Sequence, residues 1–102
     1  MECLNKVELR GFVGNVRSDV IGDTILTRFS VATNHLCVGA DGESMIETTW
    51  HACKSFDKEA AKIEKGDKVH LSGRIQNQRY VDSDGNNKSS FEILVNNLEI
   101  DN

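Results

Sequence analysis

The 102 residues are enough for one small domain with a modest core, and we expect a single domain over residues 1–102. Hydrophobic residues make up 38% of the chain and no apolar run approaches membrane length, which argues against a membrane-spanning protein. The formal net charge of −4, taken alone, argues against a nucleic-acid partner, because binders of nucleic acid usually carry a basic balance.

The N-terminus and the cysteines both predict a cytoplasmic protein. The opening residues, MECLNKVELRG, lack the apolar stretch and small-residue cleavage site of a signal peptide. Cys3, Cys37 and Cys53 are odd in number and lack the spacing of a disulfide framework, so we expect reduced thiols.

The first half of the chain predicts three strands, which cover Val7–Val16, Thr24–Asn34 and Ile46–Lys54. Gly11 and Gly14 interrupt the first strand, as the bulges and bends of small barrels do. Alternation in the second strand favours a core face made of Ile25, Thr27, Phe29 and Val31.

The period changes after the third strand. Phe56, Ala60 and Ile63 recur at helical spacing and predict a short amphipathic helix over Phe56–Lys65, ending at Gly66. Two more strands follow, Lys68–Val81 and Ser89–Ile100, joined by a hairpin turn of Asp, Gly and Asn residues. Five strands with a helix between the third and fourth predict an all-β, five-stranded Greek-key barrel, the OB-fold. A β-sandwich gives the helix no natural place.

Aromatic and basic side chains share predicted strand faces. Period-two alternation places Trp50 and Lys54 on one face of the third strand, and Arg74 and Tyr80 on the outward face of the fourth. Arg28 and Arg79 add positive charge to predicted strands. Flat rings for bases and cations for phosphates are what single-stranded nucleic acid requires.

A structural role is the alternative for each ring. Trp50 fits a plug of the barrel as well as an exposed platform, and strand aromatics are commonly structural. Tyr80 fits cross-strand packing beside the hairpin turn. The spacing of Phe56 to Ala60 and Ile63 suits an anchor of the helix, and Phe29 is expected in the core. Phe12 falls on the face opposite its apolar neighbours, and Phe91 has no clear assignment.

No cofactor, metal site or enzymatic activity is expected. The two His-x-Cys pairs, His35/Cys37 and His51/Cys53, could chelate zinc, but they lack the usual Cys knuckles and His35 falls in a predicted loop. No motif for nucleophilic catalysis or phosphate cradling is present, and DSDGNN is turn chemistry rather than a carboxylate pair.

Several motifs together resemble a known family. They are NKVELRG (5–11), FSVATN (29–34), ETTWH (47–51), KGDKV (65–69), GRI (73–75) and YVDSDG (80–85). In this order, over nearly the whole chain, they closely resemble the bacterial-type single-stranded DNA-binding protein.

The resemblance implies an OB-fold that forms a homotetramer and wraps single-stranded DNA without sequence preference, in replication, recombination and repair at the nucleoid. The family's stacking aromatics fall here on Trp50, Phe56 and Tyr80. Its phosphate-contacting positions fall on Lys6, Lys58, Lys65 and Arg79, and its subunit-interface histidine falls on His51.

Two departures from the family pattern stand out. The segment after the second strand, NHLCV, lacks a further aromatic residue. Positions that are often basic in the family are occupied here by Ala52, Gln76 and Gln78. Both changes favour DNA binding that is weaker or less dependent on salt. The sequence stops at Asn102 without the family's flexible tail and its acidic tip, so it is either trimmed or a short version, and the usual tail-mediated replication and repair partners are in doubt.

Two other OB-fold roles compete with this reading. A primosome-type module would form a dimer, bind DNA and bridge other proteins, and such proteins are about as long as this chain. An OB-fold used only for protein interaction would not bind DNA at all, in keeping with the acidic charge.

Overall fold

The computed structural model describes residues 2–101, and its five strands form one closed barrel. The strands are β1 (Val7–Ile21), β2 (Thr24–Val38), β3 (Ser44–Ser55), β4 (Lys68–Val81) and β5 (Asn87–Ile100). Their order around the barrel is β1-β2-β3-β5-β4, and β1 pairs with β4 to complete the circle. All pairs are antiparallel except β3 with β5, which meet in parallel at Cys53 and Lys54. The predicted OB-fold barrel is confirmed.

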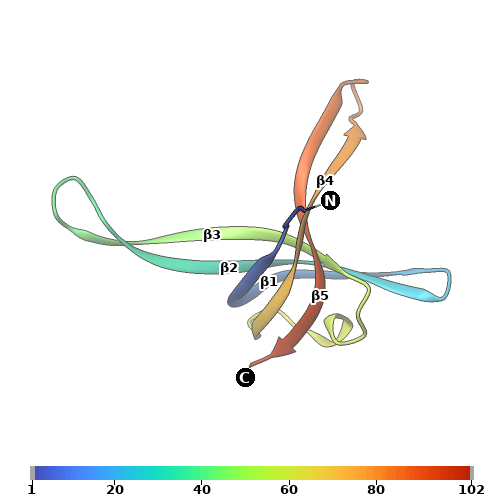
Figure 1. Ribbon diagram of the computed structural model, residues 1–102, viewed down its shortest axis with the longest axis horizontal. Coiled ribbons are helices and arrows are strands. Elements are labelled where there is room, and N and C mark those ends of the chain that lie inside the picture. Colours follow the sequence, from blue (N-terminus) through green and yellow to red (C-terminus); the bar gives the residue numbers. More distant parts are fainter. Residues whose placement is uncertain (1, 102) are drawn as a thin grey trace.

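Three two-stranded ribbons project from this barrel (Figure 1). The β2–β3 ribbon extends to the left, the β1–β2 ribbon to the right and the β4–β5 ribbon upward. The sequence prediction ended β1 at Val16 and β2 at Asn34, and both boundaries were too short. His35, predicted in a loop, pairs with Glu47 inside the β2–β3 ladder. The strands continue because cross-strand pairing extends beyond the barrel wall.

The core lies where the strands close on one another. Phe29 and Val31 from β2 belong to one buried cluster with Leu71 from β4, and Ala60 and Ile63 from the β3–β4 connection belong to the same cluster. Phe29 is buried as predicted. Ile25, predicted on the core face, is half exposed, because it pairs with Val20 in the projecting β1–β2 ribbon.

The predicted helix is only one 3₁₀ turn, η1 (Ala60–Lys62). Its hydrogen bonds run three residues back, from Ala60 to Asp57 and onward to Ile63, and Ile63 is already extended. Ala60 and Ile63 are buried as their spacing predicted, but Phe56 is half exposed and does not anchor the turn. The connector is shorter than the ten residues of the pattern because Asp57 and Asp67 bond to nearby backbone N–H groups instead of allowing further helical turns.

Candidate nucleic-acid interface

Trp50 lies on the outside of the barrel wall with 61% of its surface exposed. It pairs with Ala32 across β2–β3, and its ring reaches over β1, where a methyl group on Gly14 would come within 2.5 Å of Cζ3. The strand β1 is bulged at this point, and the Asn15 N–H donates to Ser30 Oγ at 3.0 Å. The bulge and the missing side chain at Gly14 therefore make a seat for an exposed indole.

Lys65 is the cation that shares a hollow with Trp50. That hollow is lined by Gly14, Asn15, Ser30, Trp50 and Lys65. The sequence predicted Lys54 beside Trp50, but the Lys54 side chain is only 15% exposed and its Nζ lies 3.5 Å from Glu92 Oε1. Arg28 also turns to this carboxylate, with Nε 3.5 Å from Oε2. The charges of Arg28 and Lys54 are thus already engaged within the protein.

His51 faces away from Trp50, as alternation predicted. Its Nε2 lies 2.9 Å from Thr33 Oγ1, and the ring is partly buried. This hydrogen bond holds the imidazole where the β2–β3 ribbon begins to project from the barrel.

Phe56 extends the row of outward residues on β3 just beyond the last strand residue, Ser55. Ser55 is fully buried and its Oγ accepts the Asp57 N–H and donates to the Val95 carbonyl oxygen. This bonding ties down the chain on either side of the exposed ring. Lys58 follows two residues later and is exposed.

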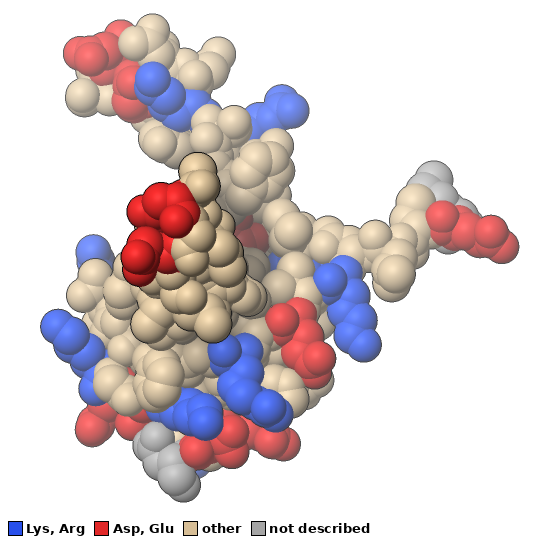
Figure 2. Space-filling view, turned by 90° about the vertical axis from the view of Figure 1, so that its left-hand side faces the viewer, with Lys and Arg blue, Asp and Glu red and all other residues tan. Residues whose placement is uncertain are grey.

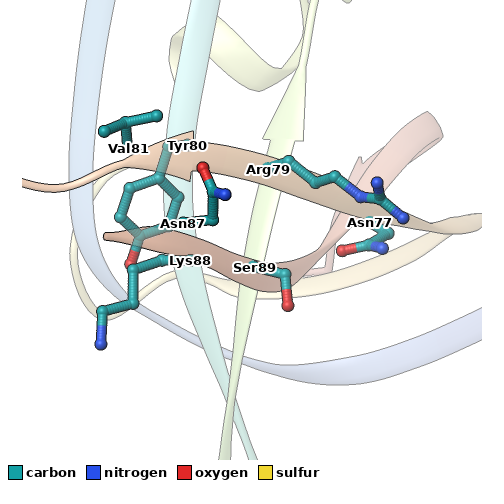
Figure 3. A pocket seen from close by; sticks show the side chains of 7 residues that line it. All are labelled: Asn77, Arg79, Tyr80, Val81, Asn87, Lys88 and Ser89. Carbon is teal, nitrogen blue, oxygen red and sulfur yellow. The ribbon is translucent and has the colours of Figure 1, made fainter. Parts of the chain in front are cut away.

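Tyr80 and Arg79 are neighbours on β4 in the β4–β5 ribbon, and their side chains extend in different directions (Figure 3). The Tyr80 ring lies next to Lys88, its cross-strand partner on β5, while Arg79 extends along β4 toward Asn77. A hollow of about 500 Å³ is lined by both residues. The pairing of Tyr80 with a lysine was not anticipated, since it depends on the exact register of the hairpin.

Lys6 and Arg74 meet where β4 leaves the barrel. Val7 pairs with Gly73, so the residues before and after them, Lys6 and Arg74, come to the same edge. Asn5 secures this edge, since its Nδ2 donates to the Ile75 carbonyl at 2.8 Å and its Oδ1 accepts the Ile75 N–H at 3.0 Å. Both basic side chains are exposed.

Phe91 is the aromatic that sequence reasoning left unassigned. It is 70% exposed and lines an apolar hollow with Trp50 and Ile75 at the base of the β4–β5 ribbon. Its alternation with the buried Ile93 and Val95 resembles that of a core residue. Leu36 and Ile46 were also missed; they pair with each other on the same side of the β2–β3 ribbon as Trp50, and both are exposed.

Acidic side chains gather at the tips of the ribbons, although others lie among the basic side chains of the body. Figure 2, in which the β2–β3 ribbon points toward the viewer, shows acidic side chains at its tip, while Lys and Arg side chains are spread over the body below. The tip carries Asp41 and Glu43, and the β4–β5 tip carries Asp82 and Asp84. Within residues 2–101, five of the predicted basic residues form no ion pair: Lys6, Lys58, Lys65, Arg74 and Arg79.

The cysteines have no arrangement suited to chemistry. Cys53 is buried, and burial followed by the nearby Glu92 charge raises the pKa of its thiol to about 12, so it stays protonated at neutral pH. Among residues 2–101, no group of three His, Cys, Asp or Glu side chains is close enough to hold a metal ion. In the same range, no helix has the length and apolar character needed to cross a membrane.

Comparison with known proteins gives one consistent result. A model of the "Single-strand binding protein family" matches residues 4–101. The chain is 33% identical over 104 residues to the "Single-stranded DNA-binding protein" of Neisseria meningitidis serogroup A, covering 95% of this chain and 59% of the relative. It is 31% identical over 108 residues to the "Single-stranded DNA-binding protein, mitochondrial" of Pongo abelii, covering 93% and 73%. The chain therefore spans little more than half of the bacterial relative's length.

Solved structures agree on the fold. The "Plasmodium falciparum SSB complex with ssDNA" superimposes with a TM-score of 0.88 at 24% identity, covering 100% of this chain and 98% of that one. A deletion mutant of the single-stranded DNA binding protein from Thermus aquaticus gives a TM-score of 0.79 at 17% identity, covering 97% and 51%.

Proposed function

Because the chain belongs to the single-strand binding protein family, we propose that it binds single-stranded DNA without sequence preference and protects it, with no chemical step. The observation that carries this proposal is the exposed Trp50 ring seated over Gly14, with Lys65 in the same hollow. An exposed ring beside an unpaired cation offers one base a platform and its phosphate a counter-charge. The family and the names of the relatives support the same ligand.

Trp50, Phe56 and Tyr80 are the proposed stacking residues. Phe91 is exposed as well, but it lies on the same face of β5 as the core residues Ile93 and Val95 and lines a hollow with His51, so we do not include it among them. Stacking on such rings contributes about 1–3 kcal/mol per base. Because every base has a flat face, this mode of binding does not select a sequence.

The phosphate contacts are proposed for the unpaired cations. Lys58 and Lys65 lie near the barrel, Lys6 and Arg74 at the root of the β4–β5 ribbon, and Arg79 farther along it. Arg28 and Lys54 lie on the same side of the sheet as Trp50, but we propose only weak phosphate contacts for them because Glu92 offsets their charge.

We also propose a homotetramer with His51 at a subunit interface, acting at the nucleoid in the cytoplasm during replication, recombination and repair. The exposed apolar residues on the ribbons support assembly, since Leu36, Val38 and Ile46 are covered by nothing within residues 2–101. The family relationship supports the cellular role.

The direct test uses Trp50 as the only tryptophan. Titration with oligo(dT) is expected to quench its fluorescence, while a duplex of the same length leaves it unchanged. The log of the binding constant is expected to fall with the log of salt concentration by about 0.7 per phosphate neutralised.

Variants separate the site from the fold. Trp50→Ala is expected to weaken oligo(dT) binding, followed by anisotropy of a labelled oligonucleotide, by about 1–3 kcal/mol. Val20→Ala, which removes an exposed apolar side chain at the far end of β1 in the β1–β2 ribbon, is the control and is expected to retain affinity. An OB-fold used only for protein interaction would give no binding by any form, and a dimer in sedimentation would favour the primosome-type alternative over the tetramer.

A further inference from the structure

Glu92 places a carboxylate between two basic side chains on the proposed DNA-binding face. The residue is 8% exposed, although it lies on the outward side of β5 next to the core residue Ile93. Its Oε2 lies 3.5 Å from Arg28 Nε and its Oε1 lies 3.5 Å from Lys54 Nζ. One buried anion therefore serves two cations.

The strand register explains why the anion is needed. Arg28 and Lys54 are direct cross-strand partners in β2 and β3, and like charges in that position repel each other. Lys54 also pairs in parallel with Leu94 on β5, two residues beyond Glu92 and on the same face. The carboxylate thus reaches both cations from the neighbouring strand and offsets their repulsion.

The burial of this group makes the pairing firm. Within residues 2–101, Glu92 Oε1 accepts no hydrogen bond, so the Lys54 ammonium is the group that offsets its charge. A buried charge without a partner is strongly unfavourable, which holds Lys54 in place. Arg28 is half exposed at the mouth of a hollow that Ala52 and Glu92 also line, where a phosphate could approach it.

We propose that Glu92 is an internal competitor for DNA phosphate, which holds Arg28 and Lys54 and thereby limits both the affinity and the salt dependence of binding. The proposal rests on the single-stranded DNA binding proposed above. According to this proposal, the Glu92 carboxylate prevents Arg28 and Lys54 from binding DNA phosphates strongly.

Glu92→Gln tests the proposal with an isosteric side chain that lacks the charge. We expect it to tighten oligo(dT) binding on the order of fivefold at low salt and to steepen the log–log salt slope by about 0.7 to 1.4, for one or two phosphates. Glu43→Gln makes the same charge change at the exposed β2–β3 tip, and it is expected to leave the slope as it is. Equal effects of the two variants would reduce the result to net charge and overturn the proposal.

Two further variants keep the test valid if Glu92→Gln fails to fold because Lys54 is left buried and unpaired. The double variant Lys54→Met/Glu92→Gln removes that charge and frees Arg28 alone, so the slope is expected to steepen by about 0.7. In the native background, Arg28→Gln is expected to reduce the slope by less than half as much as Arg74→Gln, whose side chain has no ion pair within residues 2–101.

The outcomes distinguish the two proposals. If the wild-type protein binds oligo(dT) and Arg28→Gln lowers the slope as much as Arg74→Gln, Arg28 already holds a phosphate and the role of Glu92 is wrong. If neither the wild-type protein nor the Glu92 variants bind oligo(dT), the proposed function fails and the role of Glu92 fails with it.

Discussion

The barrel and the ribbons that project from it are built by the same strands, yet they treat apolar residues in opposite ways. On β5, Ile93 and Val95 are buried, while Phe91 on the same face is exposed because the strand has left the barrel. On β2, Phe29 and Val31 fill the core, whereas Leu36 and Val38 are exposed on the ribbon. Alternation therefore identifies a face of a strand, and the extent of the barrel decides whether that face is covered.

The largest expected effect contrasts one leucine from each region. Leu71→Ala removes a side chain that is 1% exposed and is expected to cost about 2–5 kcal/mol in the free energy of unfolding by urea. Leu36→Ala removes one that is 76% exposed in the single subunit, so at dilutions where the subunits are separate the expected change is within about 0.5 kcal/mol. A comparable loss for both would mean that Leu36 is buried between subunits, and the loss would then depend on protein concentration.

A smaller effect is expected when either of two glycines of β1 is replaced by alanine. One replacement tests close packing of the backbone, and the other tests the placement of the Trp50 ring. A methyl group on Gly11 would collide with the backbone carbonyl of Ala32, so Gly11→Ala is expected to destabilise the fold by about 1–3 kcal/mol. On Gly14 the methyl group would meet the Trp50 ring and Ser30 Oγ.

Because an exposed ring can move, Gly14→Ala is expected to change stability less than Gly11→Ala but to weaken oligo(dT) binding. Thermal unfolding and anisotropy titration of both variants measure the two effects. A Gly14→Ala protein with native affinity would show that the seat of Trp50 is not used in binding.

The last effect comes from the buried thiol of Cys53, and it is absent at neutral pH and appears only in alkali. Its pKa is about 12 in the folded protein against an ordinary value of 9.0, so the folded state keeps a proton that the unfolded state loses. This stabilisation is complete below about pH 9 and declines as pH rises toward 12, with about 1.4 kcal/mol lost near pH 10. Urea unfolding of Cys53→Ala is expected to show a shallower decline; an identical decline would contradict the assignment.

Much of the barrel could be predicted from local pattern. The fourth strand was placed at its observed bounds, because a turn signal lies at each end. The burial of Ala60 and Ile63 followed from their spacing, although the expected helix reduced to one 3₁₀ turn. The ribbons were not predicted, since nothing in a residue's own neighbourhood reports how far the cross-strand pairing continues.

The candidate site was predictable in its rings more than in its charges. Period two placed Trp50 and His51 on opposite faces of the third strand, but it left open whether Trp50 is a plug or an exposed platform, and the family resemblance favoured exposure. The engagement of Lys54 by Glu92 did not, because the two residues are far apart in sequence and meet only through the parallel contact of β3 with β5. A basic side chain on the proposed binding face is available for phosphate only if no other strand supplies a carboxylate that pairs with it.

The seat of Trp50 over Gly14 makes two positions on different strands depend on each other. A residue with a Cβ at position 14 fits only if the ring at position 50 moves or becomes smaller, and a smaller ring removes the need for glycine. Substitutions at the two positions are therefore expected to be non-additive, so that a change harmful at one becomes tolerable once the other has occurred. During evolution, replacement of Trp50 by a smaller residue would have to precede replacement of Gly14. The pair is therefore an epistatic constraint on how the binding face can evolve.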